Sequence, residues 1–324
     1  MKVISVRNLK KNYKAYQKEP GFVGSVKSLF SRKYEQVAAV DDISFEIEEG
    51  ELIGFIGPNG AGKTTTLKCL SGLLYPSSGH VDVLGFSPWK RNNKFLKQIS
   101  LVMGQKNQLW WDLPPIESFL LNKEIYEIPG DKFKEMLSEL SELLEIEDIL
   151  RVQVRKLSLG QRMKCELVAA LLHSPRVLFL DEPTIGLDVV MQKKLRDFIK
   201  EYNKRFGSTI ILTSHYMEDV RQLCERIIII DHGKILYDGK LSDVVRRYSK
   251  EKLIKVIFNQ KVKPEAIEPF GKINEFDGQS ATIVIPRSKA PEAVAAILKK
   301  FSVDDINIEE PAIEEIIRDV FTKK

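Results

Sequence analysis

Short apolar runs alternate with longer segments of helical periodicity over the first 240 residues of the chain. The runs are rich in isoleucine, leucine and valine, and they lie at residues 51–56, 99–104, 177–181, 208–214 and 227–230. Such runs are typical of strands in the middle of a parallel sheet, where both faces are buried. Because helical patterns stand between them, the sequence predicts an α/β fold.

Residues 113–150 have apolar side chains at helical spacing throughout. The clearest repeats are Phe133, Met136, Leu137, Leu140, Leu143 and Leu144. This spacing predicts amphipathic helices that bury one side each. We therefore expect a small helical subdomain, at about 106–165, between two strands of the sheet.

The pattern changes again from about residue 246. Residues 253–259 and 281–286 alternate or cluster β-branched side chains, whereas 290–301 and 311–321 have helical spacing. The run from Phe276 to Gly278 favours a turn between strands. The sequence thus predicts two domains, residues 1–245 and a small C-terminal α+β domain of residues 246–324.

Composition agrees with two folded domains. The chain has 324 residues, of which 43% are hydrophobic, enough to fill two cores. No apolar run approaches the length of a membrane span, and the first residues lack the apolar core of a secretion signal. We interpret Cys69, Cys165 and Cys224 as reduced core residues, since they lack metal-binding spacing. A net charge of +5 does not require a nucleic-acid partner.

The stretch GFIGPNGAGKTTT, from Gly54 to Thr66, follows the apolar run at 51–56 and precedes a helical pattern. It has the spacing of a phosphate-binding loop. Glycines let backbone N–H groups approach phosphate oxygens, a helix beginning near Lys63 adds its dipole, and the lysine supplies a full charge. The Thr64 hydroxyl suits Mg²⁺. The candidate nucleotide-binding residues are Gly57, Pro58, Asn59, Gly60, Ala61, Gly62, Lys63, Thr64 and Thr65.

Two carboxylates stand at the end of the apolar run at 177–181. A strand in the middle of a parallel sheet places Asp181 at its carboxyl end, where ligands of open α/β sheets bind. Asp181 can hold Mg²⁺ through water, and Glu182 can polarise an attacking water. Acidic residues at a strand end often only solvate a loop. Together with the phosphate-binding loop, however, this pair indicates nucleotide hydrolysis.

The order of these motifs, with LSLGQ at 157–161 between them, is specific. The chain resembles the nucleotide-binding subunit of ATP-binding cassette (ABC) transporters over residues 1 to about 240. That family has a P-loop ATPase fold with a RecA-like core, an antiparallel β subdomain and a helical subdomain. The matching elements, in order, are Tyr13, GPNGAGKTT, Gln105, LSLGQ, VLFLDEP, Gly186-Leu187-Asp188 and His215.

The resemblance implies a role for each matching residue. Tyr13 stacks on adenine, and Gln105 contacts Mg²⁺ and the lytic water while sensing a membrane partner. The signature residues Ser158 and Gly160 reach the γ-phosphate held by the opposite protomer, and Gln161 of the same motif belongs to the nucleotide-binding residues. Asp188 lies in a loop that crosses the dimer interface, and His215 contacts the γ-phosphate. Leu159 departs from the family, which usually has glycine there.

Some of these residues also have simpler interpretations. Taken alone, Tyr13 would be a surface aromatic, Gln105 a solvated turn residue and His215 a structural histidine. The exposed aromatic pair Trp110 and Trp111 stands where the family docks its membrane partner, but such a pair can also pack inside the helical subdomain. Residues 14–36 contain a short basic, amphipathic segment, which suits a membrane surface, the permease or a solvated loop.

The resemblance also implies cofactors, partners and location. ATP and Mg²⁺ are expected, as are a homodimer or a heterodimer with a related ATPase and an integral-membrane permease. The expected location is cytoplasmic, at the cytoplasmic face of the membrane. The tail resembles that of the ABC-2 type exporter branch. The alternatives are a cytosolic cassette protein of DNA repair or translation, and a small-molecule kinase, against which LSLGQ and His215 argue.

Overall fold

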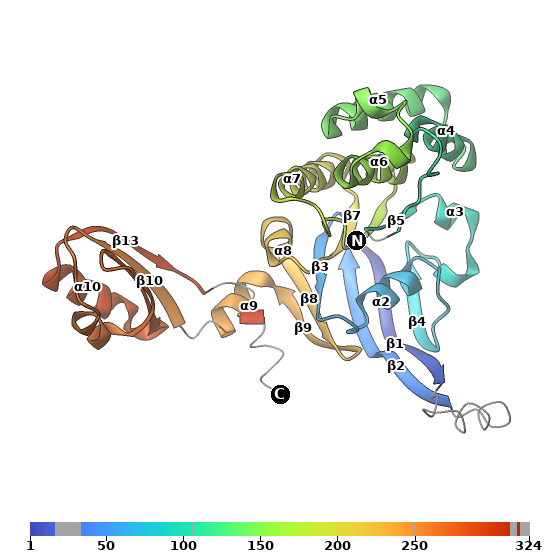
Figure 1. Cartoon of the computed structure of the whole chain (residues 1–324). Coiled ribbons are helices and arrows are strands. Elements are labelled where there is room, and N and C mark those ends of the chain that lie inside the picture. The colour runs from blue at the N-terminus through green and yellow to red at the C-terminus, as the bar shows by residue number, and fades with distance from the viewer. Residues whose placement is uncertain (17–33, 105, 249–250, 312–315, 318–324) are drawn as a thin grey trace, which may run out of the picture. The chain divides into compact units, whose positions relative to one another are not determined.

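The computed structural model describes residues 1–16, 34–104, 106–248, 251–311 and 316–317. It divides into two compact units, Met1–Asp238 and Gly239–Lys324 (Figure 1). Gln105 and the central part of the basic segment, residues 17–33, lie outside the described residues. So does most of the helix predicted at 311–321.

A six-stranded sheet forms the centre of the first unit. Its order is β5 (Ile99–Met103), β6 (Val177–Asp181), β7 (Thr209–Thr213), β3 (Leu52–Ile56), β8 (Arg226–Asp231) and β9 (Lys234–Lys240). The first five strands are parallel to one another, and every residue of β6 and β7 is buried. The parallel sheet expected from the apolar runs is confirmed, and its carboxyl ends lie along one edge.

A second, antiparallel sheet packs beside the first. Its order is β2 (Tyr34–Glu48), β1 (Lys2–Tyr16) and β4 (Ser78–Val83). Side chains of both sheets share one apolar core with the helix α2 (Lys63–Leu70). Because α2 contacts β2, β4 and β6, the phosphate-binding loop at its start is held between the two sheets.

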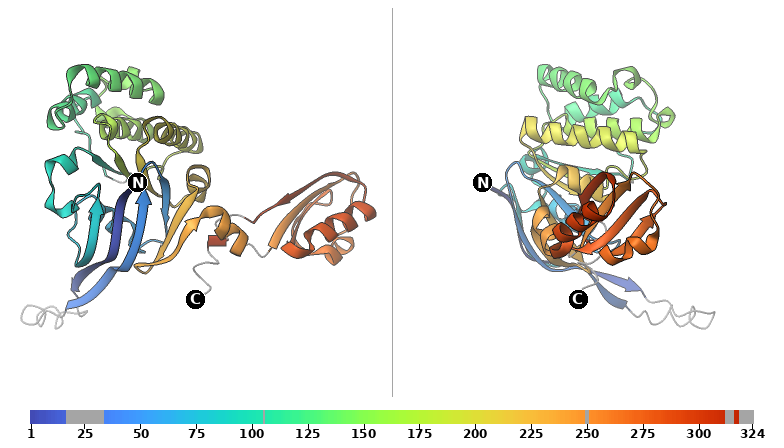
Figure 2. Two further views of the ribbon diagram at one scale, coloured as in Figure 1. Left: turned by 180° about the vertical axis from the view of Figure 1, so that it is seen from behind. Right: turned by 90° about the vertical axis from the view of Figure 1, so that its left-hand side faces the viewer.

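Further helices of the first unit lie between its strands in sequence. They are α3 (Asn93–Leu96), α4 (Pro115–Ile125), α5 (Gly130–Leu144), α6 (Leu159–Leu171), α7 (Val189–Phe206) and α8 (Met217–Leu223), with 3₁₀ turns η1 (Pro88–Lys90), η2 (Glu147–Ile149) and η3 (Val154–Lys156). Figures 1 and 2 show α4, α5 and α6 together at one end of this unit, with β1, β2 and β4 at the other.

The predicted helical periodicity places Phe133, Leu140 and Leu144 on the buried side of α5, whereas Leu143 is exposed. The three cysteines are all buried and free, as interpreted from the sequence. Among the described residues, no helix combines the length and the apolarity that a membrane span requires.

The second unit begins with the helix α9 (Leu241–Tyr248) and contains a four-stranded antiparallel sheet. The sheet order is β11 (Lys272–Phe276), β12 (Ser280–Pro286), β10 (Glu251–Phe258) and β13 (Val303–Glu309). Apolar side chains of β10 and β12 pack against α10 (Ala290–Lys300), next to the 3₁₀ turns η4 (Pro264–Ala266), η5 (Glu268–Phe270) and η6 (Arg287–Lys289). The turn predicted at Phe276–Gly278 joins β11 to β12. The strand β13 was not predicted.

Candidate active site

The phosphate-binding loop connects β3 to α2, and α2 begins at Lys63 as predicted. Two glycines of the loop are required because a side chain would clash with neighbouring backbone, and one of them also has a backbone conformation that favours glycine. A Cβ at Gly57 would lie 2.1 Å from the Ile230 carbonyl oxygen, and one at Gly62 would lie 2.4 Å from the Ala39 carbonyl oxygen. Gly62 also has a φ of 108°, which side chains rarely adopt. Any larger residue would force the loop away from both neighbouring strands.

Lys63 is buried at the centre of the loop, with 4% of its surface exposed. Its Nζ donates hydrogen bonds to the carbonyl oxygens of Gly57 at 2.7 Å and Pro58 at 3.1 Å. Burial lowers the pKa of Lys63, while the carboxylates of Glu182 and Asp181 act in the opposite direction. The loop backbone therefore holds the Lys63 ammonium at its centre, where it can form an ion pair with a phosphate.

Asp181 joins three elements at the carboxyl edge of the sheet. The Thr64 hydroxyl, from the first turn of α2, donates to Asp181 Oδ2 at 2.8 Å. The Thr213 hydroxyl, at the end of β7, donates to Asp181 Oδ1 at 2.8 Å. A carboxylate beside a threonine hydroxyl is an all-oxygen donor set, which suits a small hard cation such as Mg²⁺. The sequence singled out Asp181 and Thr64 but missed Thr213.

Glu182 and His215 face each other across the ends of β6 and β7. The Nε2 atom of His215 lies 2.6 Å from Oε1 of Glu182. Glu182 is 8% exposed, and its φ of 56° is unusual for a residue with a side chain. Its backbone N–H donates to the Thr213 hydroxyl at 3.0 Å, which fixes the turn. The two residues predicted to act on the lytic water and the γ-phosphate are thus in direct contact.

Gln105 lies outside the described residues, but the residue before it is well placed. The Gly104 N–H donates to the Asp181 carbonyl oxygen at 2.9 Å. A Cβ at Gly104 would lie 2.1 Å from the carbonyl oxygen of Glu182. Gly104 therefore lies against the backbone of Asp181 and Glu182.

Tyr13 belongs to β1 and pairs with Val37 of β2, two residues from Ala39, whose carbonyl lies against Gly62. Tyr13 is 40% exposed, and Lys11 Nζ lies 5.3 Å from the centre of its ring. An exposed aromatic ring near the phosphate-binding loop is available for stacking on a base. Stacking on adenine stays a prediction.

The signature residues form the start of α6. The N–H of Gln161 donates to Ser158 Oγ at 3.2 Å, and the N–H of Ser158 donates to Gln161 Oε1 at 3.0 Å. This reciprocal pair is a capping box. Among the described residues, no hydrogen bond joins Ser158, Gly160 or Gln161 to the phosphate-binding loop. Within the described part of one chain, hydrogen bonds therefore join the loop to Asp181 but do not join the signature to the loop.

Leu159, the departure from the family pattern, does not disturb this helix start. Its Cδ2 atom lies 3.1 Å from where a Cβ on Gly186 would be, and a Cβ on Gly160 would lie 2.9 Å from Met191 Cγ. Asp188, between these contacts, caps α7 by accepting a hydrogen bond from the Met191 N–H at 2.8 Å. The signature and the loop of Asp188 thus pack on each other.

A buried network, which the sequence did not reveal, holds the segments on both sides of the Glu182–His215 contact. Asp219 of α8 is fully buried and accepts hydrogen bonds from Thr184 Oγ1 at 2.5 Å, Ser214 Oγ at 2.7 Å and Arg196 Nη1 at 2.8 Å. Ser214 precedes His215. Asp219 therefore fixes the loop after β6 to the loop after β7.

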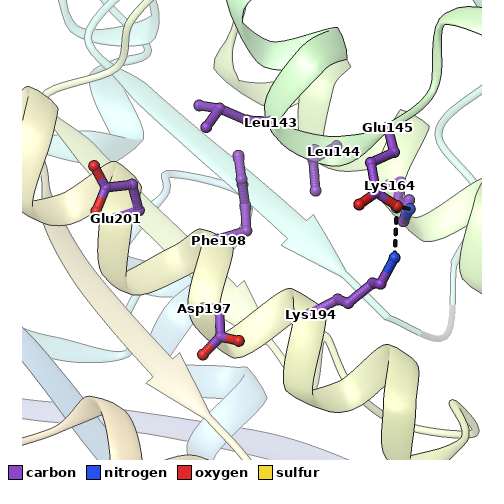
Figure 3. A pocket seen from close by; sticks show the side chains of 8 residues that line it. All are labelled: Leu143, Leu144, Glu145, Lys164, Lys194, Asp197, Phe198 and Glu201. Carbon is purple, nitrogen blue, oxygen red and sulfur yellow. Dashed lines mark hydrogen bonds and ion pairs between the residues drawn. The ribbon is translucent and has the colours of Figure 1, made fainter.

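The pocket in Figure 3 lies elsewhere, among α5, α6 and α7. It has a volume of about 260 Å³. Figure 3 shows Glu145 pointing toward two lysines, Lys194 at 2.5 Å and Lys164 at 3.8 Å. The pocket contains none of the predicted site residues. The site is therefore the open edge of the sheet, not this pocket.

The Asp219 network predicts that removing this buried carboxylate destabilises the fold far more than removing an exposed one. Asp219→Ala leaves Arg196 buried without its counter-ion, and it should lower the free energy of unfolding by about 3–5 kcal/mol. The control, Glu124→Ala, removes an exposed ion pair with Lys123, outside this network, and should cost about 0–1 kcal/mol. Urea unfolding measures both. Equal losses would show that the network does not stabilise the fold.

Two family models match the chain. One is described as ABC transporter and matches residues 40–185; the other is described as EvrA-like ABC transporter, C-terminal domain, and matches residues 250–309. The ABC transporter ATP-binding protein NatA of Bacillus subtilis (strain 168) is 33% identical over 234 residues, which are 72% of this chain and 95% of NatA. The linearmycin resistance ATP-binding protein LnrL of the same organism is 30% identical over 294 residues, which are 88% of this chain and 94% of LnrL.

Solved structures agree on the fold. A dimeric ATP-binding cassette in a post-hydrolysis state, with bound ADP and Pi, has a TM-score of 0.61 and 24% identity, covering 74% of this chain and 98% of that one. These matches confirm the predicted α/β P-loop ATPase fold with an antiparallel β subdomain and a small C-terminal α+β domain. The chain belongs to the ABC transporter family, as an ATP-binding and ATP-hydrolysing subunit.

Proposed function

We propose that the chain drives an ABC-2 type exporter by closing on ATP as a dimer, with a separate integral-membrane permease. One observation carries the proposal. Lys63, Thr64, Asp181, Glu182 and His215 come together in one chain, whereas the signature has no hydrogen bond to them among the described residues. A symmetric pair completes each site with the Ser158 of its mate.

The proposed roles follow from the geometry. Residues Gly57–Thr65 bind the phosphates of ATP, and Tyr13 stacks on the adenine. Mg²⁺, with Thr64, Asp181 and Gln105 as its proposed ligands, would neutralise phosphate charge. Glu182 orients the attacking water and accepts its proton, and His215 holds Glu182 and the γ-phosphate in register.

The second half of each site comes from the mate. The signature residues Ser158, Gly160 and Gln161 lie at the start of a helix, where N–H groups favour an anion. Asp188 lies beside them. Closure of the dimer therefore requires a γ-phosphate. When hydrolysis removes this phosphate, the two chains can separate. The mate is a second copy of this chain or a related ATPase.

A surface for the permease lies on the helical subdomain. Trp110 is 56% exposed and Trp111 is 46% exposed, so the pair is not core packing. Leu121 and Ile125 of α4 are exposed nearby in sequence. Exposed tryptophans are frequent anchors of protein interfaces. On this basis we propose that the protein lies at the cytoplasmic face of the membrane. Residues 1–245 would form the nucleotide-binding domain and residues 246–324 an accessory domain.

Export, not import, is the proposed direction. It rests on the similarity of the chain to LnrL, which is named for resistance to linearmycin and spans 88% of this chain, including most of the C-terminal unit. No role for nucleic acid is proposed, because the site and the relatives described above offer none.

Lys63→Ala should weaken ATP binding by about tenfold to a hundredfold, because it removes a charged donor from the phosphates. Titration of a fluorescent ATP analogue measures this change. Lys94→Ala, at an exposed lysine of α3, is the control and should bind normally. Unchanged binding by the Lys63 variant would exclude the phosphate role.

Glu182→Gln should keep ATP binding but slow phosphate release by about a hundredfold or more, since the carboxylate acts on the water in the transition state. The same variant should form an ATP-dependent dimer in size-exclusion chromatography. Glu201→Gln, an exposed position on α7, serves as the control. Hydrolysis by the Glu182 variant at the parental rate would refute the assignment.

A further inference from the structure

The segment Gln108–Leu113, which we call the docking loop, carries the tryptophan pair. Its far end is tied to the segment that leads into the signature. The N–H of Val154 donates to the Leu113 carbonyl at 3.0 Å, and the N–H of Arg155 donates to the Trp111 carbonyl at 3.0 Å. Arg155 also pairs with Asp112 at 3.2 Å. Arg155 stands three residues before Ser158.

The near end of the docking loop is tied to the signature helix by one buried carboxylate. Glu166 of α6 is 4% exposed, and its Oε1 accepts hydrogen bonds from the N–H groups of Gln108 at 2.7 Å and Leu109 at 3.2 Å. Its Oε2 has no hydrogen-bond partner among the described residues. One turn earlier, the Arg162 guanidinium lies 5.2 Å from the centre of the Trp111 ring.

Burying a carboxyl group costs free energy, and the two hydrogen bonds to Glu166 Oε1 offset part of that cost. Burial raises the pKa of Glu166, and the N–H groups of Gln108 and Leu109 oppose that rise. Its neighbours Cys165 and Leu167 are fully buried as well, so this part of α6 is enclosed by other side chains. Such a group is retained only where its hydrogen bonds are strong.

We propose that Glu166 is the positioning residue that locks the docking loop to α6, so that a permease pressing on Trp110 and Trp111 moves Ser158 with it. This inference rests on the proposed docking role of the tryptophan pair. Ser158 and Glu166 stand on one helix, about 12 Å apart along its axis. A helix of this length is rigid, so displacement at one point reaches the other.

Coupling between two sites is reciprocal, so ATP closure at Ser158 must also steady the docking loop. This consequence can be tested on the isolated protein, with ATP as the only probe. Hydrogen exchange of residues 106–113 is measured with and without ATP in the Glu182→Gln background. Glu166→Met removes the acceptor at similar volume, and Glu166→Gln keeps one acceptor oxygen. Glu142→Met, at an exposed position of α5, is the matched control.

Glu166→Met should exchange about tenfold faster at Gln108 and Leu109 without ATP, because the two N–H groups lose the carboxyl oxygen that accepts their hydrogen bonds. ATP should slow exchange of residues 106–113 in the parent, the Gln variant and the Glu142 control, but not in the Met variant. A thermal unfolding scan verifies that the Met variant is folded. If it is not, Glu166→Ala replaces it.

Two results overturn the inference. One is slowing of exchange by ATP in the folded Met variant to the parental extent; the other is equal loss of slowing in the Gln variant. Failure of the proposed function is a separate result, since the Glu182→Gln parent would then form no dimer with ATP. In that case the hydrogen-exchange rates of Gln108 and Leu109 without ATP test the role of Glu166. Equal rates in the Glu166→Met and Glu166→Gln variants would reject it.

Discussion

The structure depends on the hydrogen bonds that Thr64 and Thr213 donate to the carboxylate of Asp181. They join the first turn of α2 to the ends of β6 and β7, at 2.8 Å each. The parallel register makes this possible, because it aligns Met103, Asp181 and Thr213 across three neighbouring strands. Parallel strands present their carboxyl ends at one edge, so a phosphate-binding loop and its carboxylates meet without a deep pocket. The remaining site residues are positioned from this edge.

Two buried carboxylates, Asp219 and Glu166, hold further loops in place by hydrogen bonds. Asp219 fixes the loops that carry Glu182 and His215, through Thr184 and Ser214. Glu166 fixes the loop that carries the tryptophan pair to the helix that begins with the signature. Each would be costly in the interior without its hydrogen bonds. Asp219 thus orders the catalytic edge of the sheet, and Glu166 separately orders the proposed permease surface against the signature helix.

The sequence predicted what depends on neighbouring residues. The phosphate-binding loop, the start of α2 and the helix start at Ser158 follow from local spacing, and the structure has all three. Thr213, Asp219 and Glu166 escaped prediction because their partners are far along the chain: Asp219 binds Arg196, and Glu166 binds Gln108. A polar residue within an apolar helical pattern gives no signal of its partner. The strand β13 was missed for another reason, since its sequence VDDINIE is too polar to resemble a strand.

The central claim is that the site of one chain is completed by the signature of another. Engineered cysteines test it most directly, because the native cysteines are all buried. With Asn59→Cys in the phosphate-binding loop and Leu159→Cys in the signature, both in the Glu182→Gln background, the account predicts a disulfide between two chains that forms only with ATP. A folded, ATP-binding protein in which this cross-link never forms would contradict it.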